Sequence, residues 1–256
     1  MSVEKRHQLI LEQLSVKKRL TSQEIGELTG ASEATVRRDL AVLEGRGLLT
    51  RTYGGAKSMV QGRTVSEKAG AADPYLANKT QVAKTASRLI REGDTVFLGA
   101  GKTCMLLARE IKYKTNIKVI TTSINVINEL ADAPEVSLFL VGGDIYVGDN
   151  YLEALGEYTH QYLAQLYLEK SFVTVDGISM EHGYSIVNHR QIPLYQHLLN
   201  HSKEFYLLAD GHKFNKRYYS RLWSIQRVQN LVTDNSVDEK YIKYFHNAGI
   251  HCYCDR

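Results

Sequence analysis

A glycine loop in the first half of the chain contains residue types that bind phosphate. Residues 96 to 106 read VFLGAGKTCML, so an apolar run leads into Gly99-Ala100-Gly101-Lys102-Thr103. Backbone amides in such a loop can surround an anion. The loop could hold the phosphate of a nucleotide, a different phosphate, or no ligand. A nucleotide P-loop requires glycine five positions before Gly101, where this chain has Val96, so that type of loop is not predicted.

A second group of residues could contact nucleic acid. Apolar residues recur at helical spacing between Ser32 and Leu43 and predict a helix with one buried stripe. The arc that faces away from this stripe, with its flanks, contains Ala34, Thr35, Arg37, Arg38 and Ala41, and Ser32 at the helix start is expected to contact DNA with them. Arginine can bond guanine edges or neutralise phosphate in a major groove, and threonine can bond phosphate or touch a thymine methyl. The alternative is a small helical domain with incidental surface arginines.

Two helices before this one complete a helix-turn-helix pattern. An amphipathic helix is predicted from Glu4 to Leu14, with a break after it. Thr21-Ser-Gln-Glu24 is a capping box that starts a second helix, and this helix should end near Gly30. Ser32 is then a natural N-cap for the third helix. The short turn that contains glycine between the last two helices is typical of a helix-turn-helix.

A short wing is expected after the third helix. Residues 48–53, LLTRTY, predict an extended ribbon, and Gly54-Gly55 supplies its turn. Phosphate contacts are expected from basic residues of the turn and the wing: Lys17, Lys18, Arg19 and Arg51. Through Arg63 the chain has 11 Lys and Arg against 7 Asp and Glu, whereas the rest has 21 of each. The first quarter of the chain therefore carries the whole net charge of +4, and we expect it to bind a polyanion.

Composition suits two unequal domains in one chain. The 256 residues are 43% hydrophobic and 23% charged, which is ordinary for a globular protein. A membrane span or a secretory signal is not predicted, so a cytoplasmic location is expected. Cys104, Cys252 and Cys254 are interpreted as reduced thiols. Neither a metal site nor a cofactor is expected.

The remaining chain predicts an α/β domain. We assign residues 1–57 to the winged helix-turn-helix domain, residues 58–76 to a linker and residues 77–256 to the second domain. After residue 77, helical segments alternate with apolar runs, which favours a mainly parallel sheet with a ligand site at the carboxyl ends of its strands. The predicted strands are TVFL, IKVIT, SLFLV and residues 171–175, 205–209 and 229–233.

The run ASEATVRRDLAVLEGRGLLTRTYGGA, residues 31–56, resembles the signature of the DeoR family of bacterial transcriptional regulators. The later motifs agree with the family order over nearly the whole chain. The resemblance implies an amino-terminal winged helix joined to a sugar-phosphate-sensing domain whose fold is similar to ribose-phosphate isomerases and CoA transferases. Most members repress sugar-utilisation operons. The implied partners are double-stranded operator DNA, a phosphorylated sugar effector and further copies of the chain, as a dimer or tetramer.

Motifs in the second half imply an effector site at strand ends. The residues they assign to the ligand are Gly99, Ala100, Gly101, Lys102, Thr103, Thr122, Ser123, Gly142, Gly143, Asp176 and Lys213. Amides of the glycine loop and of the following helix N-terminus would hold phosphate, with a hydroxyl from Thr103. Lys213 would add a charge. Asp176 could accept hydrogen bonds from sugar hydroxyls or only form a turn, and Gly142-Gly143 could permit a turn near the ligand.

Several positions depart from the family pattern. The glycine loop is usually closer to Asp-Ser-Gly-Thr-Thr, so Gly99 replaces a carboxylate and Lys102 replaces a threonine. The identity of the sugar is therefore open. His189 and Arg190 could be phosphate ligands, but a surface position is favoured.

A sugar-phosphate isomerase is the alternative to a regulator. Such enzymes carry an Asp-Gly-Ala-Asp type motif, whereas this chain has Asp176-Gly-Ile-Ser179 and lacks the second carboxylate. Enolisation needs a positioned general base. We therefore expect binding without turnover, and an operator affinity that the ligand lowers.

Overall fold

The structure, a computed structural model, describes residues 2–17, 19–46, 48–58, 73–148 and 151–255. The chain forms two compact units, Met1–Ser66 and Glu67–Arg256. The hydrophobic core of the first unit is separate from the two clusters of the second. No helix among the described residues is long and apolar enough to cross a membrane.

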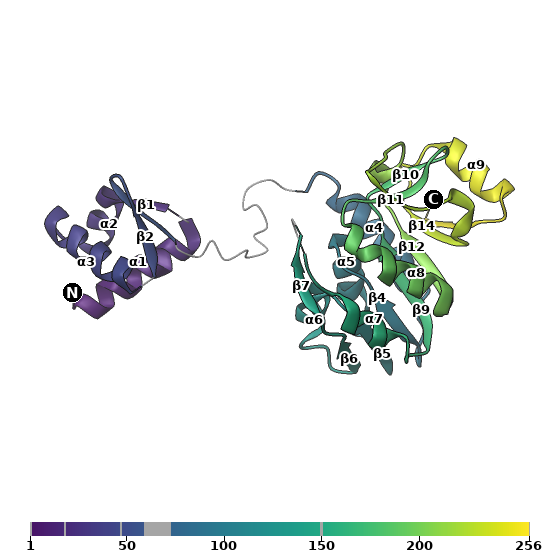
Figure 1. The fold of residues 1–256 in the computed structure, drawn as a ribbon, viewed down its shortest axis with the longest axis horizontal. Helices are drawn as coiled ribbons and strands as arrows, with labels where there is room; N and C mark the ends of the chain where they lie inside the picture. Colours follow the sequence, from purple (N-terminus) through teal and green to yellow (C-terminus); the bar gives the residue numbers. More distant parts are fainter. Residues whose placement is uncertain (1, 18, 47, 59–72, 149–150, 256) are drawn as a thin grey trace. The chain divides into compact units, whose positions relative to one another are not determined.

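The amino-terminal unit combines three helices with a small antiparallel sheet (Figure 1). Its elements are α1 (Val3–Lys17), β1 (Arg19–Thr21), α2 (Ser22–Thr29), α3 (Glu33–Gly45), β2 (Leu49–Thr52) and β3 (Gly55–Ser58). The strand order is β1-β3-β2. Ile10, Leu40 and Leu49 from α1, α3 and β2 belong to one buried cluster. The predicted winged helix-turn-helix is confirmed.

The start of α2 follows the capping-box prediction. The Glu24 amide donates to Thr21 Oγ1 at 3.1 Å, and the Thr21 amide donates to Glu24 Oε2 at 2.8 Å. The helix ends at Gly30, whose φ of 66° is the left-handed conformation that glycine adopts most readily. Ser32 occupies the N-cap position of α3 as predicted, but its side chain caps no backbone amide. Its Oγ lies 3.0 Å from Thr35 Oγ1 instead.

Two boundaries in this unit differ from the prediction. Helix α1 continues through Lys17, because residues 15–17 contain neither glycine nor proline to end it. The strand β1 was not predicted, since three residues are too few to show an alternating pattern. Leu20 in β1 is buried and pairs with Ala56 of β3. Most of the predicted linker, 58–76, lies outside the described residues, and β3 and α4 each include one residue of it at its ends.

The second unit is built on a seven-stranded parallel sheet with the order β15-β14-β12-β9-β4-β5-β6 (Figure 1). Its strands are β4 (Thr95–Leu98), β5 (Ile117–Thr121), β6 (Val136–Leu140), β9 (Leu168–Thr174), β12 (Ser202–Leu208), β14 (Asn230–Thr233) and β15 (His251–Cys254). Parallel strands bring their carboxyl ends to one edge of the sheet. The loops that follow β4, β5, β9 and β12 are therefore neighbours, as predicted for a ligand site.

Helices cover both faces of this sheet. The helices α4 (Leu76–Ser87), α5 (Lys102–Ile111) and α6 (Ile124–Leu130) contribute to one core cluster, which includes Leu107. The helices α7 (Glu157–Leu163), α8 (Ile192–His201) and α9 (Glu239–Asn247) contribute to the other, which includes Leu198. The predicted α/β class is confirmed.

Short antiparallel pieces outside the main sheet were not predicted. A hairpin joins β7 (Asp144–Val147) to β8 (Leu152–Leu155), and β10 (Gly177–Ser179), β11 (Gly183–Ile186) and β13 (Ser220–Trp223) form a three-stranded sheet. These strands contain three or four residues each. Segments of this length carry too little periodicity to separate them from loops.

Candidate functional site

Helix α3 presents the residues predicted to face DNA. Val36, Leu40 and Leu43 are buried. The exposed residues of the helix and its cap include Ser32, Ala34, Arg37, Arg38 and Ala41, and Thr35 is half-buried. The two arginines thus stand on an accessible arc of the helix. Their contacts with base edges remain a prediction.

A buried carboxylate fixes α3 against α1. Asp39 is 5% exposed and accepts hydrogen bonds from Arg6 Nε at 2.6 Å and Arg6 Nη2 at 3.0 Å. His7 Nε2 lies 3.0 Å from the same carboxylate. The hydrogen bond from Arg6 holds the pKa of Asp39 below its ordinary value. The sequence did not indicate this contact, because Asp39 lies 33 positions from Arg6 and 32 from His7.

The predicted basic residues of the turn and wing are exposed where the structure describes them. Lys17 pairs with Glu24 at 3.1 Å, Arg19 is in β1 and Arg51 is in β2. Lys18 lies outside the described residues. Tyr53 is fully exposed in the turn between β2 and β3.

The glycine loop between β4 and α5 has the local geometry of an anion site. Gly101 is the N-cap of α5, with φ 109°, and no side chain caps the amides of the first turn. Such amides carry the positive end of the helix dipole. A Cβ at Gly99 would lie 3.3 Å from Val173 Cγ1, so the loop packs closely on β9. Thr103 is buried in the first turn of α5 and Lys102 is half-buried at its first position.

The side chains after β5 have partners within the protein. The Thr122 hydroxyl donates to Glu153 Oε1 at 3.1 Å. Ser123 Oγ accepts from the Val126 amide at 3.4 Å and so caps α6. Both residues are fully buried. Their assignment to the ligand remains a prediction, and the structure gives each a structural role.

Glu153 is an internal acid that the sequence did not indicate. It lies in β8 with no exposed surface, and Gln191 Nε2 donates to its Oε2 at 2.7 Å. Burial raises the pKa of Glu153 to about 7, although the bonds from Gln191 and Thr122 act in the opposite direction. The Ala154 amide donates to the Thr122 carbonyl at 2.8 Å. The hairpin of β7 and β8 is thereby attached to the end of β5.

Asp176 and Lys213 are brought together from two different strand ends. Lys213 Nζ lies 3.6 Å from Asp176 Oδ1, and Asp176 Oδ2 accepts from the Val187 amide at 2.8 Å. Asp176 therefore shapes its turn and also faces a cation. Burial lowers the pKa of Lys213, and Asp176 partly opposes this effect. A cation held in a partly desolvated position is well suited to bind a phosphate dianion.

The loop that carries Lys213 is anchored by two aspartates. The Gly211 amide donates to Asp234 Oδ1 at 2.6 Å, and His212 Nδ1 contacts Asp210 Oδ1. Burial, together with the nearby charges of Lys213 and Lys79, lowers the pKa of His212 to about 4. The imidazole is therefore neutral at physiological pH.

The chain that enters the second unit packs directly on this loop. The Tyr75 ring stacks on His212 with centroids 4.0 Å apart and planes 3° apart. Lys79 Nζ pairs with Asp73 at 2.7 Å. Asn78 Nδ2 donates to Asp234, which also holds Gly211. We call residues 73–79 the entry segment. These contacts were not predicted.

Gly142 and Gly143 have a packing role that is independent of ligand. The Thr159 hydroxyl donates to the Gly142 carbonyl at 2.7 Å. A Cβ at Gly143 would lie 2.2 Å from Thr159 Oγ1 and 2.7 Å from the Leu155 carbonyl, so only glycine fits there. His189 and Arg190 are exposed, consistent with the favoured surface position. Among the described residues, no group of three or more His, Cys, Asp or Glu side chains could hold a metal ion.

Family models match both units. A DeoR-like helix-turn-helix domain matches residues 6–61, and a DeoR C-terminal sensor domain matches residues 75–235. The structure is also distantly similar to ribose 5-phosphate isomerase A of Methanocaldococcus jannaschii, with 19% identity, a TM-score of 0.41 and coverage of 57% of this chain and 56% of that one. This similarity is too distant to transfer a ligand or an activity.

Similar sequences extend over most of the chain. A lactose phosphotransferase system repressor of Staphylococcus epidermidis is 35% identical over 86% of this chain and 87% of its own length. An HTH-type transcriptional regulator named FruR from Bacillus subtilis is 32% identical over 91% of this chain and 92% of its own. A lactose phosphotransferase system repressor of Lactococcus lactis is 30% identical over 96% of both chains. The chain therefore belongs to the DeoR family of transcriptional regulators.

Proposed function

We propose that this regulator represses a carbohydrate-utilisation operon in the cytoplasm and that a phosphorylated sugar weakens its binding to operator DNA. One observation carries this proposal. The N-terminus of α5 at Gly101, which no side chain caps, and the Lys213–Asp176 pair both lie at the carboxyl edge of the same parallel sheet. Two of the relatives are named lactose phosphotransferase system repressors. The exposed arginines of α3 supply the DNA-binding half.

The two parts of a phosphosugar would meet different groups. The phosphate would accept hydrogen bonds from the first amides of α5 and from the Thr103 hydroxyl, with charge from Lys102 and Lys213. Sugar hydroxyls would donate to Asp176. Gly99 leaves out the carboxylate that the family loop usually carries, so the hydroxyl contacts of this loop would differ from those of most relatives.

The entry segment gives a route from the effector to the DNA-binding unit. Lys213 is the direct neighbour of His212, on which Tyr75 stacks. A phosphate that draws Lys213 away from Asp176 would move the loop and disturb this stack. The entry segment overlaps the last residues of the predicted linker, so its rearrangement would change the positions that two winged helices can take on paired half-sites.

An isomerase function is less consistent with the geometry. Glu153 has the pKa near 7 that a general base needs. However, it is fully buried and both of its oxygens accept hydrogen bonds from the protein. Ser179 stands where isomerases of this kind place a second carboxylate. We therefore propose binding without turnover.

One experiment separates binding from turnover. The full chain is incubated with pentose and hexose phosphates while its thermal unfolding and the sugar composition are followed. A ligand present at 100 times its Kd should stabilise the fold by about 2.7 kcal/mol, with the sugar phosphate unchanged. Catalytic conversion of an aldose phosphate to a ketose phosphate would contradict the proposal.

A further inference from the structure

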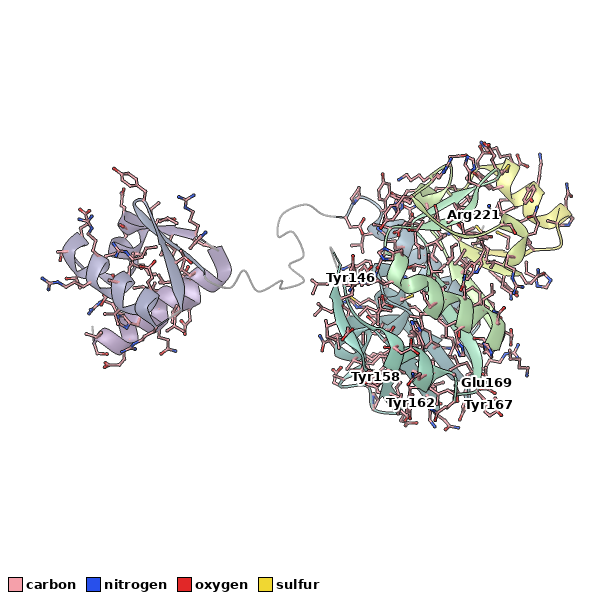
Figure 2. All side chains as sticks on the ribbon, viewed as in Figure 1. Tyr146, Tyr158, Tyr162, Tyr167, Glu169 and Arg221 are labelled. Atoms are coloured by element: carbon pink, nitrogen blue, oxygen red, sulfur yellow. The ribbon has the colours of Figure 1, made fainter. Side chains whose placement is uncertain are left out.

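A second lysine lies near Lys213, on the entry segment of the second unit. Lys79 belongs to the first turn of α4, and its Nζ lies over the Tyr75 ring, 5.6 Å from the centroid. The same ring stacks on His212, which directly precedes Lys213 in the chain. The two lysines therefore approach one region at the carboxyl edge of the sheet, at the other end of β9 from Glu169 (Figure 2).

Both ammonium groups are largely withdrawn from solvent. The side chain of Lys79 is 12% exposed, and that of Lys213 is 21% exposed. Burial lowers the pKa of Lys213, and the charges of Lys79 and Lys216 act in the same direction. Like charges disfavour one another more strongly where water is partly excluded. A doubly charged anion between the two lysines would relieve this repulsion.

Each of the two lysines pairs with a carboxylate that a phosphate could replace. Lys79 Nζ lies 2.7 Å from Asp73 Oδ2, and Lys213 Nζ lies 3.6 Å from Asp176 Oδ1. The second distance is longer than a good hydrogen bond. A phosphate dianion carries three strong acceptor oxygens, so it can accept from two ammonium groups at once.

One buried aspartate holds the two segments together. Asp234 has no exposed surface, and it accepts hydrogen bonds from the Asn78 side chain and from the Gly211 amide. Asn78 directly precedes Lys79, and Gly211 belongs to the loop that carries Lys213. Both lysines are thus attached to a common anchor, which positions them for one shared anion.

We propose that Lys79 is a further binding residue of the effector site, and that the phosphate of the sugar phosphate bridges Lys79 and Lys213 and displaces Asp73. This inference rests on the proposed function, because it assigns one more contact to the same site. Asp73 also accepts a hydrogen bond from the Tyr75 amide at 2.9 Å. Its release would therefore change the end of the predicted linker, and the effector would act on the entry segment by direct contact.

Two substitutions in the full chain test this contact. Thermal unfolding is followed against inorganic phosphate, ribose 5-phosphate and fructose 6-phosphate at constant ionic strength, which gives an apparent Kd for each anion that stabilises the wild type. Lys79→Gln should weaken each such Kd roughly tenfold, because a charge-assisted hydrogen bond is lost. Asp73→Asn should strengthen each Kd at least about twofold, because Lys79 loses a competing anion.

The opposite signs of these effects separate a ligand contact from a supporting role. If the Lys79–Asp73 pair only held the entry segment in place, both substitutions would break it and both would weaken binding. Lys79→Arg keeps the cation and should retain most of the affinity. Lys84→Gln is the matched control, because Lys84 is exposed on the same helix, and it should leave each Kd unchanged.

Three results would overturn the inference. The first is a Kd that Lys79→Gln leaves unchanged while Lys213→Gln weakens it at least tenfold, and in that case the proposed function stands without this contact. The second is weaker binding in Asp73→Asn. The third is a wild type that none of these anions stabilises, which would overturn the proposed phosphate site as well.

Discussion

Lys102 places a positive charge where a helix least favours one. It occupies the first position of α5, beside the positive end of the helix dipole, where a cation costs about 0.3–1 kcal/mol. A bound phosphate would reverse this effect by pairing with both the lysine and the amides.

Lys102→Thr should weaken the effector response and leave unliganded operator binding intact. Loss of one charge-assisted bond to phosphate should reduce phosphosugar affinity roughly tenfold, as measured by thermal shift against ligand concentration. An equal loss of operator affinity without ligand would mean that the loop is structural.

Glu153 should make stability fall as pH rises. Burial raises its folded pKa to about 7 from an ordinary 4.5, so the folded state holds the proton more tightly than the unfolded state. Its contribution is greatest below pH 4.5, declines as pH rises through 7, and then stays constant. At 1.36 kcal/mol per pKa unit, the range is about 3 kcal/mol. Glu153→Gln should remove this dependence, as measured by melting temperatures between pH 4.5 and 8. Parallel profiles for variant and wild type would contradict it.

At the scale of elements, the entry segment and the loop 210–213 act as one unit. The Tyr75 ring and the Asn78–Asp234 bond attach the start of α4 to the loop that carries Lys213, and the Lys79–Asp73 pair holds the entry segment together. These contacts join the proposed effector site to the end of the predicted linker. Breaking one contact should therefore separate ligand binding from its consequence for DNA.

Tyr75→Ala should bind phosphosugar but respond to it less on the operator. The stack on His212 is lost, whereas Lys213, Asp176 and the amides of α5 remain. Tyr75→Phe keeps the ring and should retain the response. Tyr219→Ala is a control, because Tyr219 is 75% exposed and lies outside the entry segment. Ligand titrations of operator binding should show a smaller effect only in Tyr75→Ala; a wild-type response in that variant would exclude this route.

Local signals decided how much of the fold was predictable. The capping box at Thr21, the glycine at the end of α2 and the apolar runs of the central strands depend on neighbouring residues, so the sequence displays them. The Glu153–Gln191 hydrogen bond joins residues 38 positions apart in the sequence. The Tyr75–His212 stack joins the start of the second unit to the loop after β12. Such contacts arise from packing, which no short pattern records. The sequence therefore predicted which strand ends form the candidate site. It did not predict that Glu153 and the Tyr75–His212 stack support the loops at those ends.

At the scale of the whole molecule, the features expected for DNA binding and those expected for effector binding lie in different units. The first has the basic excess and the exposed arginines of α3, and the second has the parallel sheet with the residues that we propose bind the effector at its edge. Repression relieved by a ligand requires that the second unit change the operator affinity of the first. Coupling free energies of this kind are typically 1–3 kcal/mol, which corresponds to changes of about 5–150-fold.

Operator binding by the full chain, titrated with phosphosugars, tests this coupling most directly. Fluorescence anisotropy would follow a labelled duplex from the DNA beside its own gene, with Arg37→Ala/Arg38→Ala as the variant that should lose binding in all conditions. The account predicts that one phosphorylated sugar lowers the wild-type affinity at least fivefold, while the unphosphorylated sugar does not. Unchanged affinity with every phosphosugar, for protein that remains bound to the operator, would contradict it.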